Sequence, residues 1–380
     1  MARHARRLVA PIGRPVRRAV VARRTRDWEP HSRLFIGQEA AEWVLSYEAR
    51  QLERTAGALG VELGPRDWVN AVAGQSIFHQ SQFTLLLQDF ERRGNNLGFA
   101  YFHGRPGTPR MPEFDACFAA MRRRHEEIDR VQVTNREMEE LVLETGMGAD
   151  KVHRIPIGID VETFTLRSPD GGAAARRAFG LPESAFVVGS FQKDGVGWGE
   201  GKEPKLIKGP DVLLSVAEQL RDRVPELWLL LTGPSRGFVR AGLDRLGIPY
   251  RHALLDDVDA VARAYDAIDV CVVASRDEGG PRAVLESMAT GVPLVTTRVG
   301  QAADLVEHGV NGWMVDVEAV EALTAAIEHI AGATSGELDL ARRAGRETAE
   351  ANSYSALRPR WRALLDGFVA IRDGVVSGWT

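Results

Sequence analysis

The sequence is poor in cysteine and has no long apolar run. Its two cysteines, Cys117 and Cys271, form no pairing pattern, which excludes a disulfide-stapled scaffold and favours a reducing compartment. No run approaches the roughly 20 apolar residues of a membrane-spanning helix and no secretory signal opens the chain, so we expect a cytoplasmic protein. Hydrophobic residues make up 44% and charged residues 26% of the 380, which excludes collagen-like and disordered classes.

Motifs of several common enzyme classes are also missing. The chain has no Walker pattern, no Gly-x-Ser-x-Gly turn and no Gly-x-Gly-x-x-Gly after an early strand. These absences argue against a P-loop nucleotide hydrolase, an α/β-hydrolase and a Rossmann dehydrogenase. The nine histidines and two cysteines show no metal-ligand spacing, so no metal is expected.

Lysine is scarce, and most of it is clustered. Only five of the 48 basic residues are lysines, and four of these fall within residues 193–208: Lys193, Lys202, Lys205 and Lys208, with Lys151 outside. A lysine ammonium is a compact point charge that suits phosphate oxygens. The cluster therefore indicates a phosphate site, unless codon bias and chance produced it.

Charge is unevenly distributed along the chain. Residues 1–26 contain nine arginines and no acidic residue, so residues 27–380 carry a formal charge of −13, whereas the whole chain carries −4. Residues 1–32 therefore form a basic N-terminal arm. Valine and isoleucine recur at near-helical spacing in it, which favours an amphipathic helix on anionic lipid. A solvated, disordered tail is the alternative.

The rest of the chain alternates between strand-like and helix-like segments, which predicts an α/β protein with two Rossmann-like domains facing a cleft. We expect an N-terminal domain over residues 33–155, a C-terminal domain over 156–350, and a C-terminal helix within 351–380 that crosses back to the first domain. The clearest strands are 186–190, 227–232, 249–253, 269–274, 293–297 and 313–315. Ligands of such sheets bind beyond the carboxyl ends of the strands.

Residues 275–293 follow one of these strands and carry the densest set of signals. Pro281 and Gly291 frame a short helix from both ends. Its N-terminus follows Gly279-Gly280, where an anion can approach bare backbone. Glu278 precedes the helix and Glu286 lies inside it, and a carboxylate can accept two hydrogen bonds from a vicinal diol such as ribose. The alternative is that Glu278 caps the helix and Glu286 is a solvated surface residue.

This segment resembles the Glu-x7-Glu region of the retaining glycosyltransferases of family 4, which have the GT-B fold. The similarity rests on Glu278-Gly-Gly-Pro and Leu285-Glu-Ser-Met-Ala-Thr-Gly-Val-Pro293, and continues through Val299-Gly-Gln and His308-Gly-Val-Asn-Gly. It also includes Ile155-Pro-Ile-Gly-Ile-Asp160, which is similar to the segment between the family's domains. The likeness covers residues 95–330, and the first 94 only in outline.

The resemblance implies a role for most of the candidate residues. In the family, the residue matching Glu286 binds the ribose of a nucleotide sugar, the one matching Glu278 lies at the donor sugar, and two basic residues bind the diphosphate without a metal. Here the matching basic positions are Lys193 and Lys208, although an insertion, Gly195 to Lys205, separates them and weakens the match for Lys193. The remaining residues implied at the site are Gly279, Gly280 and Pro281 at the phosphates, Gly233 beside the nucleobase, and His103 facing the donor sugar.

Three further segments have an interpretation of lower weight. Arg236 is placed near the nucleobase, and Gly74-Gln75-Ser76 resembles the acceptor loop of the family. Asp257-Val-Asp259 has the Asp-x-Asp form of a different glycosyltransferase fold, but because it precedes a helix we interpret Asp257 as its cap.

The sequence thus predicts a retaining transferase that moves a sugar from a nucleotide-diphosphate sugar to a hydroxyl of a saccharide or lipid-linked acceptor. The expected setting is the synthesis of cell-surface polysaccharides, glycolipids or glycosides, with peripheral contact to anionic membrane through residues 1–26 and no nucleic-acid partner. The alternatives are another GT-B enzyme, such as a sugar-nucleotide epimerase or a pseudo-glycosyltransferase, and a non-catalytic nucleotide-sugar-binding protein. The sugar, the nucleobase and the acceptor are not determined by the sequence.

Overall fold

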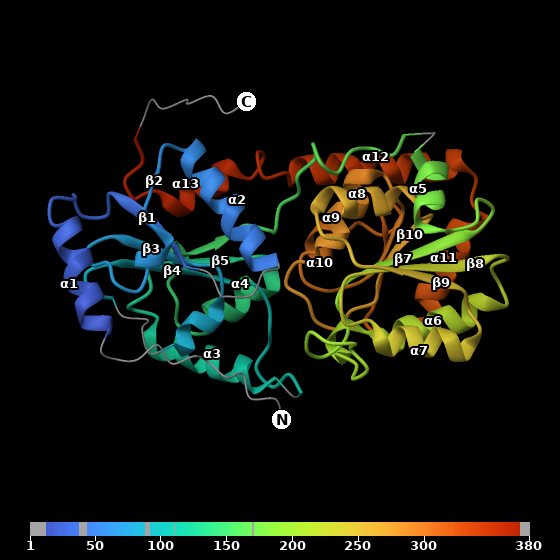
Figure 1. Cartoon of the computed structure of the whole chain (residues 1–380), viewed down its shortest axis with the longest axis horizontal. Coiled ribbons are helices and arrows are strands. Elements are labelled where there is room, and N and C mark those ends of the chain that lie inside the picture. Colours follow the sequence, from blue (N-terminus) through green and yellow to red (C-terminus); the bar gives the residue numbers. More distant parts are fainter. Residues whose placement is uncertain (1–12, 38–43, 88–91, 110, 169–170, 373–380) are drawn as a thin grey trace. The chain divides into compact units, whose positions relative to one another are not determined.

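The computed structural model describes residues 13–37, 44–87, 92–109, 111–168 and 171–372. The chain divides into two compact units, and both appear in Figure 1. The N-terminal unit comprises Met1–Val133, Glu139–Ile155 and Arg358–Thr380, and the C-terminal unit comprises Thr134–Met138 and Pro156–Leu357. Each unit is built on one parallel sheet of six strands, which confirms the predicted α/β class.

The sheet of the N-terminal unit has the order β2-β1-β3-β4-β5-β6. Its central strands are buried on both faces, which is typical of parallel sheets covered by helices. The strands are β1 (Arg33–Gly37), β2 (Glu62–Leu63), β3 (Ser76–His79), β4 (Asn96–Tyr101), β5 (Arg130–Val133) and β6 (Val152–Arg154). The helices of this part of the chain are α1 (Gly13–Thr25), α2 (Val44–Ala58), α3 (Pro112–Arg124), α4 (Arg136–Leu143) and α13 (Arg358–Leu365).

The sheet of the C-terminal unit has the order β12-β11-β10-β7-β8-β9, with every pairing parallel. The strands are β7 (Phe186–Phe191), β8 (Leu227–Thr232), β9 (Tyr250–Ala253), β10 (Val270–Val273), β11 (Leu294–Thr297) and β12 (Trp313–Val315). All six lie where the sequence predicts them. The strand order reverses direction between β7 and β10, which makes the carboxyl ends of these two strands the expected ligand crevice.

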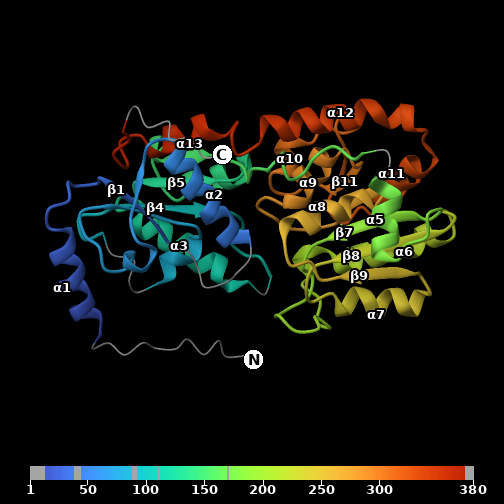
Figure 2. The same ribbon diagram turned by 45° about the horizontal axis from the view of Figure 1, so that its top comes forward.

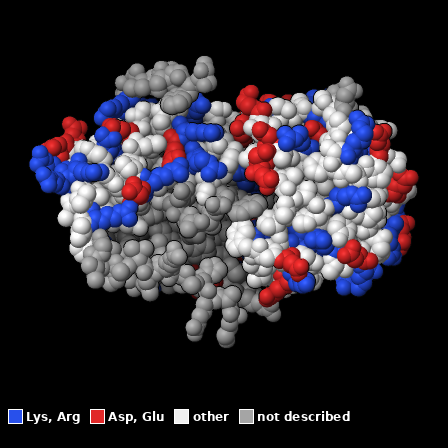
Figure 3. All heavy atoms as spheres, viewed as in Figure 1, with Lys and Arg blue, Asp and Glu red and all other residues white. Residues whose placement is uncertain are grey.

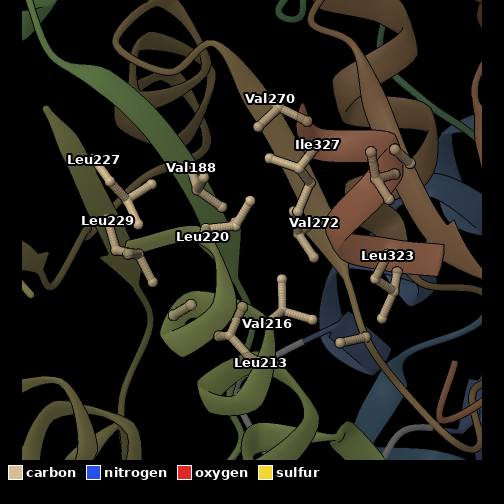
Figure 4. Close-up of a cluster of buried hydrophobic side chains, with 14 of the residues drawn as sticks. Val188, Leu213, Val216, Leu220, Leu227, Leu229, Val270, Val272, Leu323 and Ile327 are labelled. Carbon is tan, nitrogen blue, oxygen red and sulfur yellow. The ribbon is translucent and has the colours of Figure 1, made fainter. Parts of the chain in front are cut away.

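Helices cover both faces of this sheet (Figure 1). On one face, α6 (Pro210–Arg221), α7 (Gly237–Leu246) and α11 (Val320–Gly332) enclose an aliphatic core. Figure 4 shows that core, in which Leu213, Val216 and Leu220 of α6 meet Val188 of β7 and Val272 of β10. On the other face lie α5 (Gly171–Phe179), α8 (Val258–Asp266), α9 (Arg282–Thr290), α10 (Ala302–Leu305) and α12 (Ser335–Ala351).

The end of the chain differs from the sequence prediction. One helix was expected over residues 354–372, whereas the structure has α12 at Ser335–Ala351 and a shorter α13 at Arg358–Leu365, both seen in Figure 2. The start of α12 is a capping box of Thr334 and Glu337, a signal that the sequence contained. Within the N-terminal unit, Trp361 of α13 meets the ring of Phe78 edge-on at 6.0 Å.

The basic arm is partly ordered on the N-terminal unit. Its first twelve residues lie outside the described part, but α1 begins at Gly13 and buries Val21, so a solvated tail is wrong for this portion. Trp28 then stacks on Trp68 at 6.0 Å, which holds the end of the arm against the unit. Val16 and Val20 of α1 stay exposed. None of the helices in the described ranges is long and apolar enough to cross a bilayer.

Opposite charges are mixed on the surface of the C-terminal unit. On the face drawn in Figure 3, basic and acidic side chains are interspersed over this unit. Elsewhere in the same unit, partly buried ion pairs form between Arg176 and Asp269 at 2.6 Å and between Arg276 and Asp211 at 2.7 Å. On this face, therefore, the acidic excess of residues 27–380 does not produce a patch of one sign.

Candidate functional site

The carboxyl ends of β7 and β10 bring the candidate residues of the C-terminal unit together. Strand β7 leads into Gln192 and Lys193, and β10 leads into Ser275 and Glu278. The Gln192 side chain links these segments, since its Nε2 donates to the carbonyl of Lys208 at 2.8 Å and its Oε1 accepts from Ser275 Oγ at 3.4 Å. Three separate stretches of sequence thus meet at the point where the strand order reverses.

Glu278 and Lys208 form an ion pair at this edge, with side chains only 11% and 19% exposed. Ser275 Oγ donates to the other carboxylate oxygen at 3.0 Å and fixes its orientation. The backbone brings Lys208 here through Gly209, whose φ is 63° and whose Cα packs against the carbonyl of Ala274 so closely that a side chain would clash. Glu278 therefore binds a cation, and it does not act as the side-chain cap of α9.

Three of the five lysines surround this carboxylate. Burial lowers the pKa of Lys205 to about 8; the charges of Lys208 and Lys193 lower it further, and that of Glu278 opposes them. Burial also lowers the pKa of Lys193, and the charge of Lys208 adds to that effect. Cations that lower one another's pKa in a partly desolvated place are typical of a site that receives an anion. The lysine cluster seen in the sequence is therefore a cluster in space.

Helix α9 holds Glu286 in a buried position. Its carboxylate accepts from the Tyr265 hydroxyl at 2.9 Å and pairs with Arg282 Nε at 3.1 Å, and the side chain is 8% exposed. A solvated surface role is therefore wrong. Each oxygen retains a lone pair that can accept from a hydroxyl. Gly291 ends the helix in a left-handed conformation as predicted, whereas Pro281 is its N-cap and not its first residue.

The two glycines before α9 are required by packing. A Cβ on Gly280 would lie 2.7 Å from Gln301 Oε1 and 2.9 Å from Ile157 Cδ1. The Gly279 carbonyl accepts from the Gln301 amide, Thr134 Oγ1 and Asn135 Nδ2, each at 2.9 Å. The loop is therefore held rigidly before any ligand binds. Packing alone therefore explains the two glycines, without a bound anion. The first amides of α9 nevertheless have no side-chain acceptor, because Pro281 is the N-cap.

Two of the predicted residues lie at strand ends outside this cluster. Gly233 follows β8 with φ 85°, and its carbonyl is 2.8 Å from His252 Nε2. His103 follows β4 in the N-terminal unit, where its ring meets Phe114 edge-on at 5.2 Å and Gln82 Nε2 donates to its carbonyl at 2.8 Å. Both positions are at carboxyl ends of strands, and neither role is tested by these contacts.

Two of the lesser interpretations are wrong and one is confirmed. Arg236 does not reach outward to a nucleobase, because its side chain is fully buried and paired with Asp194 at 3.1 Å. Ser76 begins β3 and Gln75 precedes it, at the edge of the sheet opposite the carboxyl ends, and Gln75 Oε1 accepts from the Arg33 amide at 2.9 Å. Asp257 caps α8 as predicted, accepting from the Ala260 amide at 2.6 Å.

The sequence interpretation missed two members of the site. Lys205 was part of the lysine cluster but received no role, because its position depends on how the inserted segment folds. Asp194 was not noticed at all. A single Asp beside a Gly-rich loop has no signal that distinguishes a buried ion pair from a surface residue.

Comparison with known proteins finds relatives for part of this chain. Residues 201–332 match the family of glycosyl transferases, group 1. The chain is 33% identical over 204 residues to D-inositol 3-phosphate glycosyltransferase of Corynebacterium urealyticum, which covers 49% of this chain and 45% of the relative. The enzyme of that name from Segniliparus rotundus is 30% identical over 262 residues, covering 66% and 54%. The chain thus spans about half the length of the curated relatives it matches.

Solved structures extend the likeness to the whole fold. Anabaena HepE in complex with UDP-glucose matches with a TM-score of 0.71 at 17% identity, covering 88% of this chain and 99% of HepE. Sucrose-phosphate synthase from Thermosynechococcus elongatus matches with a TM-score of 0.71 at 18% identity, covering 88% and 98%. At such identities the likeness concerns architecture alone. The chain therefore has the GT-B fold, and residues 201–332 of its C-terminal unit are similar to the group 1 glycosyl transferases.

Proposed function

We propose that this protein is a retaining glycosyltransferase that transfers a sugar from a nucleotide-diphosphate sugar to a hydroxyl acceptor. The observation that carries the proposal is the Glu278–Lys208 pair, which lies with Lys193 at the strand-order reversal of a group 1 glycosyl transferase domain. The complex of HepE with UDP-glucose, a protein of the same fold, supports a nucleotide sugar as donor.

Each residue of the C-terminal site then has a role. Lys208 and Lys193 bind the diphosphate and stabilise the charge that develops on it, so the reaction needs no metal. Glu286 accepts from the ribose hydroxyls, and the loop of Gly279, Gly280 and Pro281 turns α9 toward the donor. We place Glu278 at the donor sugar, with Gly233 toward the nucleobase.

The proposed reaction proceeds by attack on the face from which the diphosphate leaves. The bond between the sugar C1 and the diphosphate oxygen breaks while the acceptor oxygen bonds to C1, and the acceptor proton moves to the departing phosphate oxygen. The products are a glycoside and a nucleoside diphosphate. The carboxylate pair of a glycosidase is not used. The acceptor is a hydroxyl of a saccharide or of a lipid-linked molecule. The role proposed for His103 of the N-terminal unit is to face the donor sugar during the transfer.

A screen followed by product analysis tests this proposal. A nucleotide sugar at 100 times its dissociation constant should stabilise the protein by about 2.7 kcal/mol in a thermal-shift panel. Radiolabelled donor and candidate acceptors should then yield a glycoside whose anomeric configuration, read by NMR, equals that of the donor. An inverted product or an epimerised free nucleotide sugar contradicts the proposal. Tight nucleotide binding without transfer or hydrolysis supports the non-catalytic alternative.

Changing Glu286 to glutamine should weaken binding of UDP and of the donor by about tenfold to a hundredfold. The substitution keeps the shape but removes the charge, and hydrogen bonds to charged groups contribute about 1.5–3 kcal/mol. Isothermal titration measures the effect. Glu321→Gln on the exposed surface of α11 is the matched control and should change affinity less than twofold. If the two variants bind UDP with equal affinity, Glu286 does not bind the ribose.

We further propose that residues 1–26 attach the protein peripherally to anionic lipid at the inner face of the membrane. Exposed Val16 and Val20 on α1 and the nine arginines support this. Each basic residue near such a surface contributes about 1 kcal/mol, so Arg6→Gln/Arg7→Gln should weaken co-sedimentation with phosphatidylserine vesicles by about thirtyfold. The control Arg122→Gln/Arg123→Gln removes the same charge from α3. If the two double variants weaken vesicle binding equally, binding depends only on the net charge of the protein and the arm is not the attachment site.

A further inference from the structure

The segment inserted between Lys193 and Lys208 is a folded loop anchored to the C-terminal unit. The loop consists of Asp194 and the inserted residues 195–205, and the Asp194 side chain is fully buried against Arg236. Ser235 Oγ lies 3.0 and 2.9 Å from the carbonyl oxygens of Gly197 and Gly199, which share its single proton, and this contact holds the middle of the loop to the residues before α7. The loop also closes on itself, because the Lys205 amide donates to the Asp194 carbonyl at 2.8 Å.

Close backbone packing gives this loop a single position. A Cβ on Gly195 would lie 2.3 Å from the carbonyl oxygen of Ser235, and one on Gly201 would lie 2.1 Å from the same atom. The amides of Gly237 and Phe238 at the start of α7 donate to the carbonyls of Glu200 and Gly201 at 2.7 and 2.9 Å. The loop therefore fixes the positions of the residues at its two ends.

Those two ends carry lysines into the site. Lys193 immediately precedes the loop, and its Nζ lies 4.6 Å from the centre of the Trp198 ring. Lys205 is the last residue of the loop, and its carbonyl accepts from the Lys208 amide at 2.8 Å, so the two lysines share one turn of chain. The charged groups that act on Lys205 are Lys208, Glu278, Lys193 and Asp277.

Charge balance distinguishes Lys205 from Lys202 and Lys208, and the Lys193 ammonium lies over the Trp198 ring. Lys208 is paired with Glu278, and Lys202 pairs with Glu200 at 2.6 Å. Among the residues that the structure describes, none forms an ion pair or hydrogen bond with the ammonium of Lys205, although this side chain is half-buried. Lys208 and Lys193 act on it with like charge, and the carboxylates of Glu278 and Asp277 act on it without bonding to it. A desolvated cation with like-charged neighbours is unfavourable until an anion joins it.

We propose that Lys205 is a third cationic ligand of the donor diphosphate, held in place by the inserted loop. The inference rests on the proposed function, which assigns a diphosphate to Lys193 and Lys208. It adds a ligand that the spacing of the family's two basic residues does not provide. On this proposal the insertion adds one positive charge to the diphosphate site, because the inserted loop leads the chain back to that site at Lys205.

The proposal has a consequence for pH. The free-state pKa of Lys205 is about 8, lowered chiefly by burial, so below pH 8 the ammonium is already charged and binding needs no proton. Above pH 8 the side chain is increasingly neutral, and a diphosphate restores its charge by raising its pKa. Binding should therefore take up roughly 0.7 proton at pH 8.5 and little at pH 7, and affinity should fall as pH rises through 8.

Isothermal titration of UDP into the full-length protein, at pH 7.0 and 8.5 in two buffers of different ionisation enthalpy, measures affinity and proton uptake together. We expect Lys205→Met to weaken binding about tenfold at pH 7.0 and to lose most of the uptake at pH 8.5. Lys205→Arg, which is charged at both pH values, should retain affinity better than Lys205→Met and should also lose the uptake. Lys151→Met, the lysine outside the cluster, should retain wild-type affinity and uptake.

The possible outcomes separate this inference from the function on which it rests. If Lys205→Met binds UDP like the wild type while Lys208→Met loses binding, the third ligand is wrong and the donor site stands. Unchanged proton uptake in both Lys205 variants also overturns it. If the wild-type protein binds neither UDP nor any nucleotide sugar, the proposed function fails and the inference fails with it. Equal melting temperatures of the Lys205 variants and the wild type exclude misfolding as the cause of lost binding.

Discussion

Glu278→Gln is expected to lower turnover by about 10²- to 10³-fold while UDP binds at least as tightly as to the wild type. Glycosyl transfer develops positive charge on the sugar ring, and removal of one preorganised group that stabilises such charge costs about 2.7–4 kcal/mol. The same carboxylate neutralises Lys208 in the free protein. Removal of this charge leaves Lys208 available to the diphosphate, so the protein should bind UDP more tightly. The transition state of the transfer, in contrast, loses the stabilisation that Glu278 provides.

Steady-state rates and UDP titration of the same preparation separate these two effects. Lys208→Met is the complementary variant and should weaken UDP binding as well as turnover. The double variant Glu278→Gln/Lys208→Met completes a thermodynamic cycle, in which a coupling energy of at least about 0.5 kcal/mol is expected for residues in contact. A Glu278→Gln enzyme with normal turnover and tenfold weaker UDP binding would mean that Glu278 only positions the site.

The fold was predictable wherever local signals were strong. The six strands of the C-terminal unit are short apolar runs between helices with clear ends, and Gly291 stops α9 where expected. The boundaries within residues 66–90 were not predictable, because β3 has four residues and is followed by buried polar side chains, among them Gln80 and Gln82. Hydrophobic periodicity identifies a strand only when its buried residues are apolar.

The residues of the candidate site were likewise predictable only where a local sequence signal was present. Glu278, Glu286 and Lys208 follow from sequence motifs, because each motif places its residue relative to a nearby helix end. Arg236 is expected beside the nucleobase because it follows a strand end, but it is buried with a partner, Asp194, that lies 42 positions earlier, next to an insertion. Which residues meet across an inserted loop depends on packing, for which one sequence contains no signal.

Arg236→Met is expected to destabilise the C-terminal unit by about 3–5 kcal/mol, because it leaves the carboxylate of Asp194 buried without a counter-charge. Both side chains have no solvent exposure. The guanidinium also donates from Nη1 to the carbonyls of Ser190, Gln192 and Thr232 at 2.7, 2.7 and 2.9 Å, so it joins the ends of β7 and β8. A loss of this size is a large part of the roughly 5–15 kcal/mol that stabilises a typical domain.

Hydrogen exchange of the β7 and β8 amides reports this loss without assuming that both units unfold together. Arg240→Met removes the same charge from the exposed side of α7 and should change stability by less than about 0.5 kcal/mol. Asp194→Asn/Arg236→Met removes both charges and should be more stable than Arg236→Met alone, because the buried carboxylate is then neutral. If Arg236→Met exchanges no faster than Arg240→Met, the pair does not hold the inserted loop. Lys193 and Lys205 would then be positioned by the backbone contacts of the loop alone, namely those with Ser235 and with the start of α7.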